Sequence, residues 1–133
     1  MARVLLVDDN ADVRTGMRRA LVRLGHEVVV AADGREALRA FEGDPCELVI
    51  TDINMPEMDG IELILALSAR WPKVPVIAIS GGGLLPKELL LASAEVLGVV
   101  TTLPKPVGVS DLEAAVKRAL GAAAGHGEDP SGT

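Results

Sequence analysis

The sequence predicts an α/β fold, in which a doubly wound sheet of five parallel strands, (βα)5, has helices on both faces. Five short apolar runs, rich in Val, Ile and Leu, alternate with stretches of helical periodicity. The apolar runs are nearly continuous, as is typical of parallel strands that are covered on both faces. Consecutive βα units imply right-handed crossovers, which distribute the helices over the two sides of the sheet.

Each expected element has a signal of its own in the chain. The predicted strands are residues 3–7, 27–31, 48–51, 74–79 and 99–102. The predicted helices are residues 11–24, 35–41, 60–69, 87–97 and 111–120. Four residues suit helix N-caps, the last three of them with the Glu of a capping box three residues later: Asn10, Asp33, Asp59 and Ser110. Gly25 and Gly98 suit the ends of the first and fourth helices.

The composition predicts a single domain with an aliphatic core. The chain has 133 residues, of which 49% are hydrophobic, and it contains no Tyr, one Phe and one Trp. This length is typical of one domain. From residue 121 onward the sequence is small, polar and rich in turn-forming residues. We therefore predict a domain at residues 1–120 and a disordered C-terminal tail at residues 121–133.

Charge and hydropathy argue against several classes of partner. The chain has 13 basic and 19 acidic residues, a net charge of −6 and no evident Lys/Arg cluster or basic stripe. We therefore expect no nucleic-acid binding by this chain alone. We also expect no membrane partner, because no segment is long enough to span a bilayer and the first apolar run is too short for a signal peptide. The lone Cys46 suits a reducing compartment, so we predict a cytoplasmic protein.

Polar residues gather at the carboxyl ends of the predicted strands, the edge where open α/β sheets bind ligands. They are Asp8, Asp9, Asp52, Ser80 and Lys105. Three carboxylates at one edge repel each other, and a hard divalent cation, Mg²⁺ (or Mn²⁺), relieves that repulsion. A hydroxyl and a lysine suit phosphoryl oxygens, and a carboxylate such as Asp52 is able to attack phosphorus. The set therefore indicates phosphoryl transfer to an aspartate.

The same residues also have plainer interpretations when each is taken alone. Asp8 and Asp9 suit a solvated acidic turn, and Asp52 suits a turn or a cap. Ser80 suits an ordinary strand end, and Lys105 suits the surface. Their joint occurrence at strand ends favours the metal and phosphoryl site.

Four motifs together resemble the receiver domains of bacterial two-component response regulators. They are VLLVDDN at residues 4–10, DINMPEMDG at residues 52–60, Ser80-Gly81 and Lys105-Pro106. The resemblance extends over residues 2–120, and the chain is most similar in its layout to single-domain chemotaxis regulators. It implies the flavodoxin-like strand order 2-1-3-4-5.

The resemblance implies a metal site. Asp9 corresponds to a direct Mg²⁺ ligand, and Asp8 to a residue that acts largely through water. Asp52 and the backbone carbonyl of Asn54 complete the metal ligands.

The resemblance also implies a phosphoryl site. Asp52 corresponds to the phospho-acceptor, Ser80 to the switch hydroxyl and Lys105 to the cation that pairs with a phosphoryl oxygen. The Lys105–Pro106 bond is expected to be cis. One position departs from the family, because Thr102 stands where receivers usually have Tyr or Phe. The usual aromatic read-out is therefore in question, and residues 81–83, three glycines, make the loop after Ser80 permissive.

As a receiver, the chain is expected to take its phosphoryl group from a histidine kinase or a histidine phosphotransfer protein. It would catalyse only its own phosphorylation and dephosphorylation, without turnover of an external substrate. Its output would be contact with a downstream protein, or with itself, through the apolar face at residues 84–103, although a broad core-facing stripe is the alternative for that segment. We interpret the chain as a stand-alone regulator; a module of a larger protein and a receiver that acts without phosphorylation are the alternatives.

Two enzyme or cofactor classes fit less well. Haloacid-dehalogenase-like phosphatases have a second Asp two residues after the nucleophile, where this chain has Asn54. Flavin binding on a similar topology calls for aromatic rings and a neutral first loop, and this chain has few aromatics and an acidic first loop.

Overall fold

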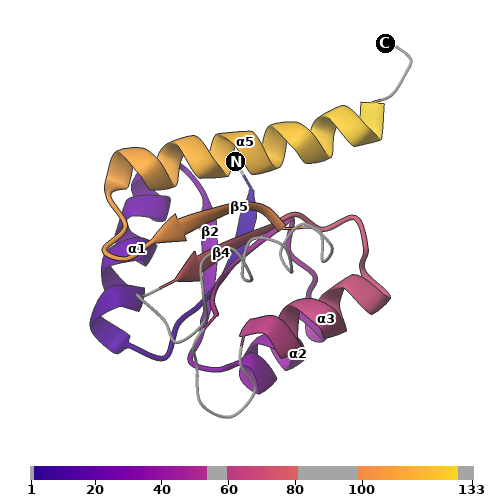
Figure 1. Cartoon of the computed structure of the whole chain (residues 1–133), viewed down its shortest axis with the longest axis horizontal. Helices are drawn as coiled ribbons and strands as arrows, with labels where there is room; N and C mark the ends of the chain where they lie inside the picture. The colour runs from indigo at the N-terminus through magenta and orange to yellow at the C-terminus, as the bar shows by residue number, and fades with distance from the viewer. Residues whose placement is uncertain (1, 54–59, 81–98, 129–133) are drawn as a thin grey trace.

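The computed structural model describes residues 2–53, 60–80 and 99–128, with side chains described as far as residue 121. It confirms the predicted fold, a five-stranded parallel sheet in the order β2-β1-β3-β4-β5 (Figure 1). The strands are β1 (Arg3–Val7), β2 (Glu27–Ala31), β3 (Leu48–Asp52), β4 (Val76–Ser80) and β5 (Val99–Pro104). The helices are α1 (Ala11–Arg23), α2 (Gly34–Gly43), α3 (Gly60–Arg70) and α5 (Val109–Glu128). The helix predicted at residues 87–97 lies outside the described residues.

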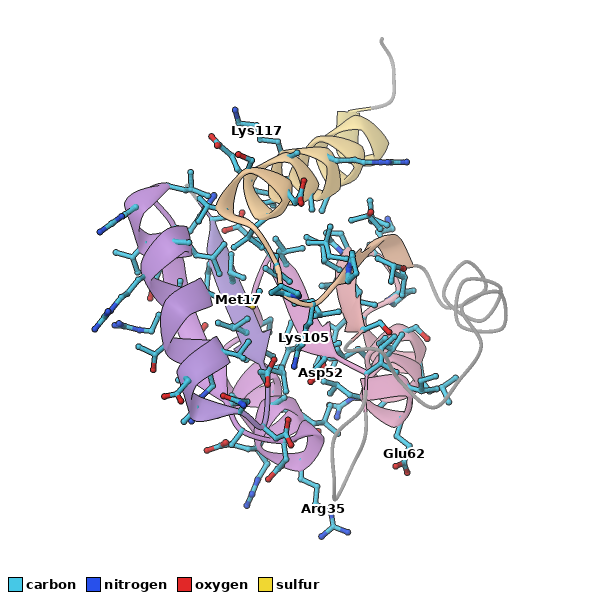
Figure 2. The ribbon with its side chains drawn as sticks, turned by 60° about the vertical axis from the view of Figure 1, so that its left-hand side comes forward. Met17, Arg35, Asp52, Glu62, Lys105 and Lys117 are labelled. Atoms are coloured by element: carbon cyan, nitrogen blue, oxygen red, sulfur yellow. The ribbon has the colours of Figure 1, made fainter. Side chains whose placement is uncertain are left out.

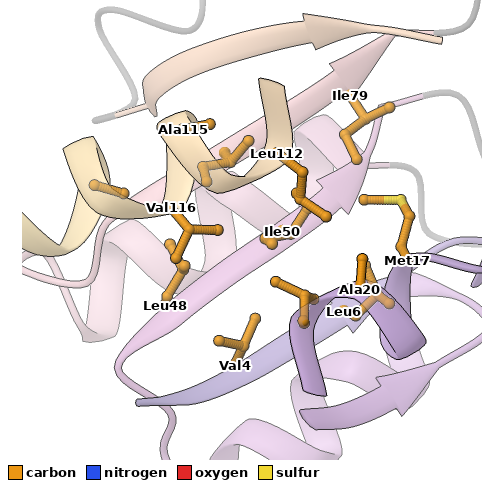
Figure 3. Close-up of a cluster of buried hydrophobic side chains, with 13 residues drawn as sticks. Val4, Leu6, Met17, Ala20, Leu48, Ile50, Ile79, Leu112, Ala115 and Val116 are labelled. Carbon is orange, nitrogen blue, oxygen red and sulfur yellow. The ribbon is translucent and has the colours of Figure 1, made fainter. Parts of the chain in front are cut away.

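The sheet is covered on both faces because consecutive residues of each strand point to opposite sides. On one face Val4 and Leu6 of β1 pack with residues of α1 and α5, such as Met17 and Leu112 (Figure 3). On the other face alternate β1 residues pack with α2 and α3, where Phe41 is fully buried. Both faces of the inner strands are therefore apolar, which explains why these strands are continuous hydrophobic runs in the sequence.

The register of the strands places the expected site residues at one edge. Val7 of β1 is opposite Thr51 of β3, so the next residues, Asp8 and Asp52, lie side by side. Asp52 is opposite Ile79 of β4, and Ser80 follows as the last residue of that strand. Asp52 and Ser80 therefore close their strands, one residue further than the predicted strands reach.

Two predicted helix caps are present and one is absent. The side chain of Asn10 accepts hydrogen bonds from the backbone N–H groups of Asp12 and Val13, as expected of an N-cap. Asp33 caps α2 by accepting from the N–H of Glu36. The Ser110 prediction is wrong, because α5 begins at Val109, one residue before it. Asp59 lies outside the described residues.

Helix ends follow the sequence less closely. Gly25 has φ 96°, a left-handed conformation, just after the C-cap of α1, as expected of a glycine in this place. The last helix does not end at residue 120, however, because α5 runs to Glu128. Residues 121–128 are thus helical where we predicted a disordered tail, and residues 129–133 lie outside the described part. Three alanines follow Gly121, and alanine is the best helix former, so the packed helix propagates through the glycines, each of which costs about 1 kcal/mol.

None of the helices in the described ranges is both long enough and apolar enough to cross a bilayer.

Candidate functional site

Three carboxylates lie together at the carboxyl ends of β1 and β3. Asp8 follows β1 and Asp52 ends β3, and both side chains are buried, whereas Asp9 is exposed. One carboxylate oxygen from each of Asp8, Asp9 and Asp52 lies within 4.8 Å of the other two. The structure thus brings together the three acidic residues that the sequence singled out.

Lys105 joins this acidic pocket from the end of β5 (Figure 2). Its Nζ donates a hydrogen bond to Asp52 Oδ2 at 2.7 Å and lies 3.0 Å from Asp8 Oδ2. Burial alone would lower the pKa of the Lys105 ammonium, but the hydrogen bond with Asp52, the contact with Asp8 and their negative charges together raise that pKa above its ordinary value. Lys105 is therefore a firmly charged cation directed at Asp52.

The backbone of Lys105 is hydrogen-bonded to the end of β4, which positions its side chain next to the acidic pocket. The N–H of Lys105 donates to the carbonyl of Ser80 at 2.9 Å, and the Lys105–Pro106 bond is cis, as expected. Ser80 is half-buried, and Thr102 is half-buried within β5, opposite Ala78 of β4. Asn54 lies outside the described residues, so its predicted carbonyl ligand stays a prediction.

Asp8 is held at both its backbone and its side chain. Its N–H donates to the carbonyl of Ala31 at 3.2 Å, and its Oδ1 accepts from the N–H of Asn10 at 2.9 Å. Its carbonyl accepts from Arg14 Nη1 at 2.7 Å. Its other oxygen, Oδ2, is buried and accepts no well-oriented hydrogen bond from a described residue.

The donor set fits a divalent cation. Three carboxylates and one ammonium carry more negative than positive charge, so the Lys105 ammonium, although it lies 3.0 Å from Asp8 Oδ2, does not by itself balance the three carboxylates. Oxygen ligands of this kind are those that Mg²⁺ prefers. Asp8, Asp9 and Asp52 are thus able to hold Mg²⁺, which would neutralise oxygens next to Asp52.

Two contributors to the site were missed by reasoning from the sequence. Gly60 approaches the backbone of Asp52 so closely that a Cβ there would lie 2.2 Å from the Asp52 carbonyl oxygen, and its N–H donates to the carbonyl of Ile53 at 3.0 Å. Arg14 was missed because no motif marks it. Gly60 does end the DINMPEMDG motif, and a glycine that closes a motif is a signal for a close backbone approach.

An apolar groove opens beside Lys105, between α1 and the start of α5. Its volume is about 620 Å³, and its walls include Val13 and Met17 of α1 and Val107 and Leu112 from the other side. Lys105 lines the same groove, so a molecule lying in it would be next to the acidic pocket.

A part-buried Asp–Lys pair with two further carboxylates, at the carboxyl edge of a doubly wound parallel sheet, is typical of a receiver-like signalling domain. The chain belongs to the response regulator receiver domain family, whose model matches residues 4–117. This confirms the resemblance in the sequence and the fold that it implied.

Similar proteins agree with the family. The chain is 37% identical over 118 residues to transcriptional regulatory protein PrrA of Mycobacterium tuberculosis, a match that covers 89% of this chain and 49% of that protein. It is 40% identical over 113 residues to protein-glutamate methylesterase/protein-glutamine glutaminase 3 of Rhodospirillum rubrum, covering 84% of this chain and 30% of that protein. The chain thus spans about half the length, or less, of the curated relatives it matches.

Solved structures of similar length also match. Chemotaxis response regulator CheY4 of Vibrio cholerae superposes with a TM-score of 0.81 at 31% identity, covering 90% of this chain and 99% of that one. A response regulator receiver domain protein from Clostridium thermocellum gives a TM-score of 0.82 at 31% identity, covering 92% and 96%. Receiver domains are signalling modules of two-component systems rather than enzymes that turn over a substrate, and they interact with histidine kinases and downstream targets.

Proposed function

We propose that Asp52 accepts a phosphoryl group from a phosphohistidine of a histidine kinase or a histidine phosphotransfer protein, with Mg²⁺ or Mn²⁺ as the cofactor. The observation that carries this proposal is the part-buried contact of 2.7 Å between Lys105 Nζ and Asp52 Oδ2 in a pocket with Asp8 and Asp9. A carboxylate poised beside a fixed cation and a metal-binding set suits attack on phosphorus. We place this chemistry in the cytoplasm.

The transfer step balances with the residues of the pocket. A carboxylate oxygen of Asp52 bonds to phosphorus as the N–P bond of phosphohistidine breaks, and the imidazole leaves with the bonding electron pair. A metal held by Asp8, Asp9 and Asp52, together with the Asn54 carbonyl, would neutralise phosphoryl oxygens. Lys105, already hydrogen-bonded to Asp52, would move its contact to a phosphoryl oxygen, and the Ser80 hydroxyl would donate to another.

The apolar groove beside Lys105 offers a place for the phosphodonor protein to bind next to Asp52. A phosphodonor that rests on Val13 and Met17 of α1 would bring its histidine to the carboxyl end of β3. Hydrolysis by water at the same phosphorus would reset the domain, so no external substrate is needed.

The output that we propose is a protein contact controlled by phosphorylation. The added charge of about −1.5 to −2 would shift an existing equilibrium between inactive and active conformations. Residues 84–98 of the expected output face lie outside the described part, and residues 99–103 belong to β5. A downstream protein or a second copy thus stays a prediction for that face.

Both a stand-alone regulator and a module of a larger protein have parallels among the similar proteins. CheY4 of Vibrio cholerae is matched over 99% of its chain, whereas PrrA is matched over 49%. We favour the stand-alone form as a proposal, with the module as its alternative. A receiver that works without phosphorylation is a further alternative, which Thr102 keeps open.

Intact mass after incubation with acetyl phosphate and Mg²⁺ tests the proposal. We expect one phosphoryl adduct on the unmodified chain and none on Asp52→Asn or without the metal. Asp111→Asn, an exposed carboxylate on α5, is the matched control and should label normally. A folded protein that gains no adduct from acetyl phosphate or from a phosphohistidine donor would favour the phosphorylation-independent alternative.

A further inference from the structure

Helix α1 has an unusual concentration of positive charge. Four of the chain's 13 basic residues lie on this 13-residue helix, whose only acidic residue is Asp12: Arg14, Arg18, Arg19 and Arg23. The expectation of no basic stripe is therefore wrong for α1, although the net charge of the chain is −6. The arginines are interrupted in the sequence, and only the helical period places them together.

Three of these arginines form a surface patch with one apolar residue at its centre. We define the α1 patch as Arg18, Arg19, Val22 and Arg23, all of them exposed. Spacings of three and four residues join Val22 to Arg18 and Arg19, and Arg19 to Arg23, so the four share one face of the helix. Val22 is 48% exposed, which is high for a valine on a helix that packs against a sheet. Figure 2 shows nitrogen-tipped side chains pointing away from the molecule along α1.

The arginines of the patch have no partner among the described residues. In the described part of the chain, Arg18, Arg19 and Arg23 form no ion pair and no side-chain hydrogen bond. Helix α2 differs, because its two arginines, Arg35 and Arg39, share their helix with Glu36 and Glu42. Of these two helices, α1 alone carries an excess of positive charge, and that charge faces solvent.

The α1 patch is also remote from the acidic pocket. Helix α1 begins at Ala11, next to the pocket, and runs toward the opposite edge of the sheet. At a rise of 1.5 Å per residue, Arg18 to Arg23 lie roughly 10–18 Å along the axis from that start. Charges on exposed groups are largely screened beyond about 8 Å at physiological ionic strength. A molecule on the patch would therefore neither cover Asp52 nor respond strongly to its charge.

We propose that the α1 patch binds an acidic protein segment, whether or not Asp52 is phosphorylated. Carboxylates of that segment would pair with Arg18, Arg19 and Arg23, and an apolar side chain of the segment would pack against Val22. Arginine beside a desolvated apolar centre is typical of protein interfaces. Nucleic acid fits less well, because its phosphates would meet a chain of net charge −6. A membrane surface fits less well too, because Val22 alone gives little apolar area to insert. This inference does not depend on phosphorylation of Asp52.

The test uses the full chain and a fluorescent synthetic helical peptide in which Glu residues flank a Leu stripe. Its control peptide has Gln in place of each Glu. Fluorescence anisotropy should show binding of the Glu peptide that weakens with salt and is the same before and after acetyl phosphate treatment. Arg19→Glu with Arg23→Glu should weaken binding about tenfold or more. Arg35→Glu with Arg39→Glu, the same change of charge at the same spacing on α2, should change it less than about twofold.

Several results would overturn the proposal. One is a wild-type chain that does not bind the Glu peptide, and another is an equal loss in both double variants, which would indicate only net charge. Tighter, patch-dependent binding of random duplex DNA or of vesicles containing phosphatidylserine would assign the patch to nucleic acid or membrane. A dimer in sedimentation that disappears in the Arg19→Glu, Arg23→Glu variant would assign it to a second copy of the chain. Circular dichroism should show that both double variants are folded.

Discussion

The two ends of the sheet each bring a cation to carboxylates, but they differ in exposure to water. At the amino ends of the strands, Arg3 contacts Glu27 and Asp44, whose side chains are 64% and 70% exposed. At the carboxyl ends, Lys105 contacts Asp8 and Asp52, whose side chains are 0% and 4% exposed. The two cations are alike, with 28% of the Arg3 side chain and 21% of the Lys105 side chain exposed, and only the carboxylates of the second cluster are removed from solvent.

This difference separates a surface feature from a functional one. Exposed ion pairs are screened and contribute little to stability, so the Arg3 cluster needs no further explanation. Buried charges are costly to desolvate, and the Lys105 cluster also has a carboxylate oxygen of Asp8 that accepts no well-oriented hydrogen bond among the described residues. A fold gains little stability from such a group, which is why buried, perturbed charges mark functional sites.

The largest expected effect comes from removing the two cations in turn. Lys105→Met should slow phosphoryl labelling of Asp52 about a hundredfold, because a fixed charge on a transferring phosphoryl group has an effect of this size. Arg3→Met should leave the labelling rate within about twofold, since Arg3 lies at the other end of the sheet. Time courses of intact mass with acetyl phosphate and Mg²⁺ measure both rates. Equal losses in the two variants would mean that the contrast between the clusters does not concern phosphoryl transfer.

Magnesium should stabilise the chain by binding in the acidic pocket of Asp8, Asp9 and Asp52, and not through the Arg3 cluster. At a hundred times its Kd, Mg²⁺ should raise the free energy of unfolding by about 2.7 kcal/mol. Asp9→Asn should lose this gain, whereas Asp44→Asn, in the Arg3 cluster, should keep it. Urea unfolding followed by Trp71 fluorescence suits the measurement, because Trp71 packs edge-on against the buried Phe41, with ring centroids 4.7 Å apart. A full Mg²⁺ gain in Asp9→Asn would remove Asp9 from the metal ligands.

Two glycines should respond in opposite ways to an added methyl group. Gly60→Ala should destabilise the fold by about 1–3 kcal/mol, because its Cβ would meet the backbone of Asp52 and Ile53. Gly16→Ala should stabilise it by about 0.5–1 kcal/mol, because nothing lies within 4 Å of a Cβ at this position in α1. Urea unfolding of both variants measures the difference. A neutral Gly60→Ala would show that the loop after Asp52 adjusts at no cost.

The sequence predicts most of the sheet, because polar residues mark where each apolar run stops. The bounds of β1 and β2 match the prediction, and β3 and β4 end one residue later, at Asp52 and Ser80. The prediction is less accurate at the start of β4, which begins two residues later than expected, and at the end of β5, which ends two residues later. The extension of α5 to Glu128 was not predicted, because propagation of a helix through glycines depends on the packed turns before them. Local composition alone does not show this cooperative stabilisation of the last turns by the turns before them.

The candidate site shows the same division. Asp8, Asp9, Asp52 and Lys105 were predicted to converge, because parallel strands share their carboxyl edge, and the structure brings them together. The contact of Arg14 with the Asp8 carbonyl was not predicted, because it depends on the position of α1 relative to the backbone carbonyl that follows β1. The structure shows that these four residues lie together, and the roles of all the site residues, Ser80 and Asn54 included, stay predictions.

The smallest expected effect is the loss of the exposed ion pairs of Arg3. Arg3→Met keeps much of the aliphatic stem and removes the ion pairs with Glu27 and Asp44, so the free energy of unfolding should fall by less than about 1 kcal/mol. The loss should shrink further at high salt, because exposed pairs are screened. Urea unfolding at low and high NaCl measures both quantities. A loss above about 2 kcal/mol that salt does not change would mean that Arg3 behaves as a buried partner, and that exposure does not distinguish the two ends of the sheet.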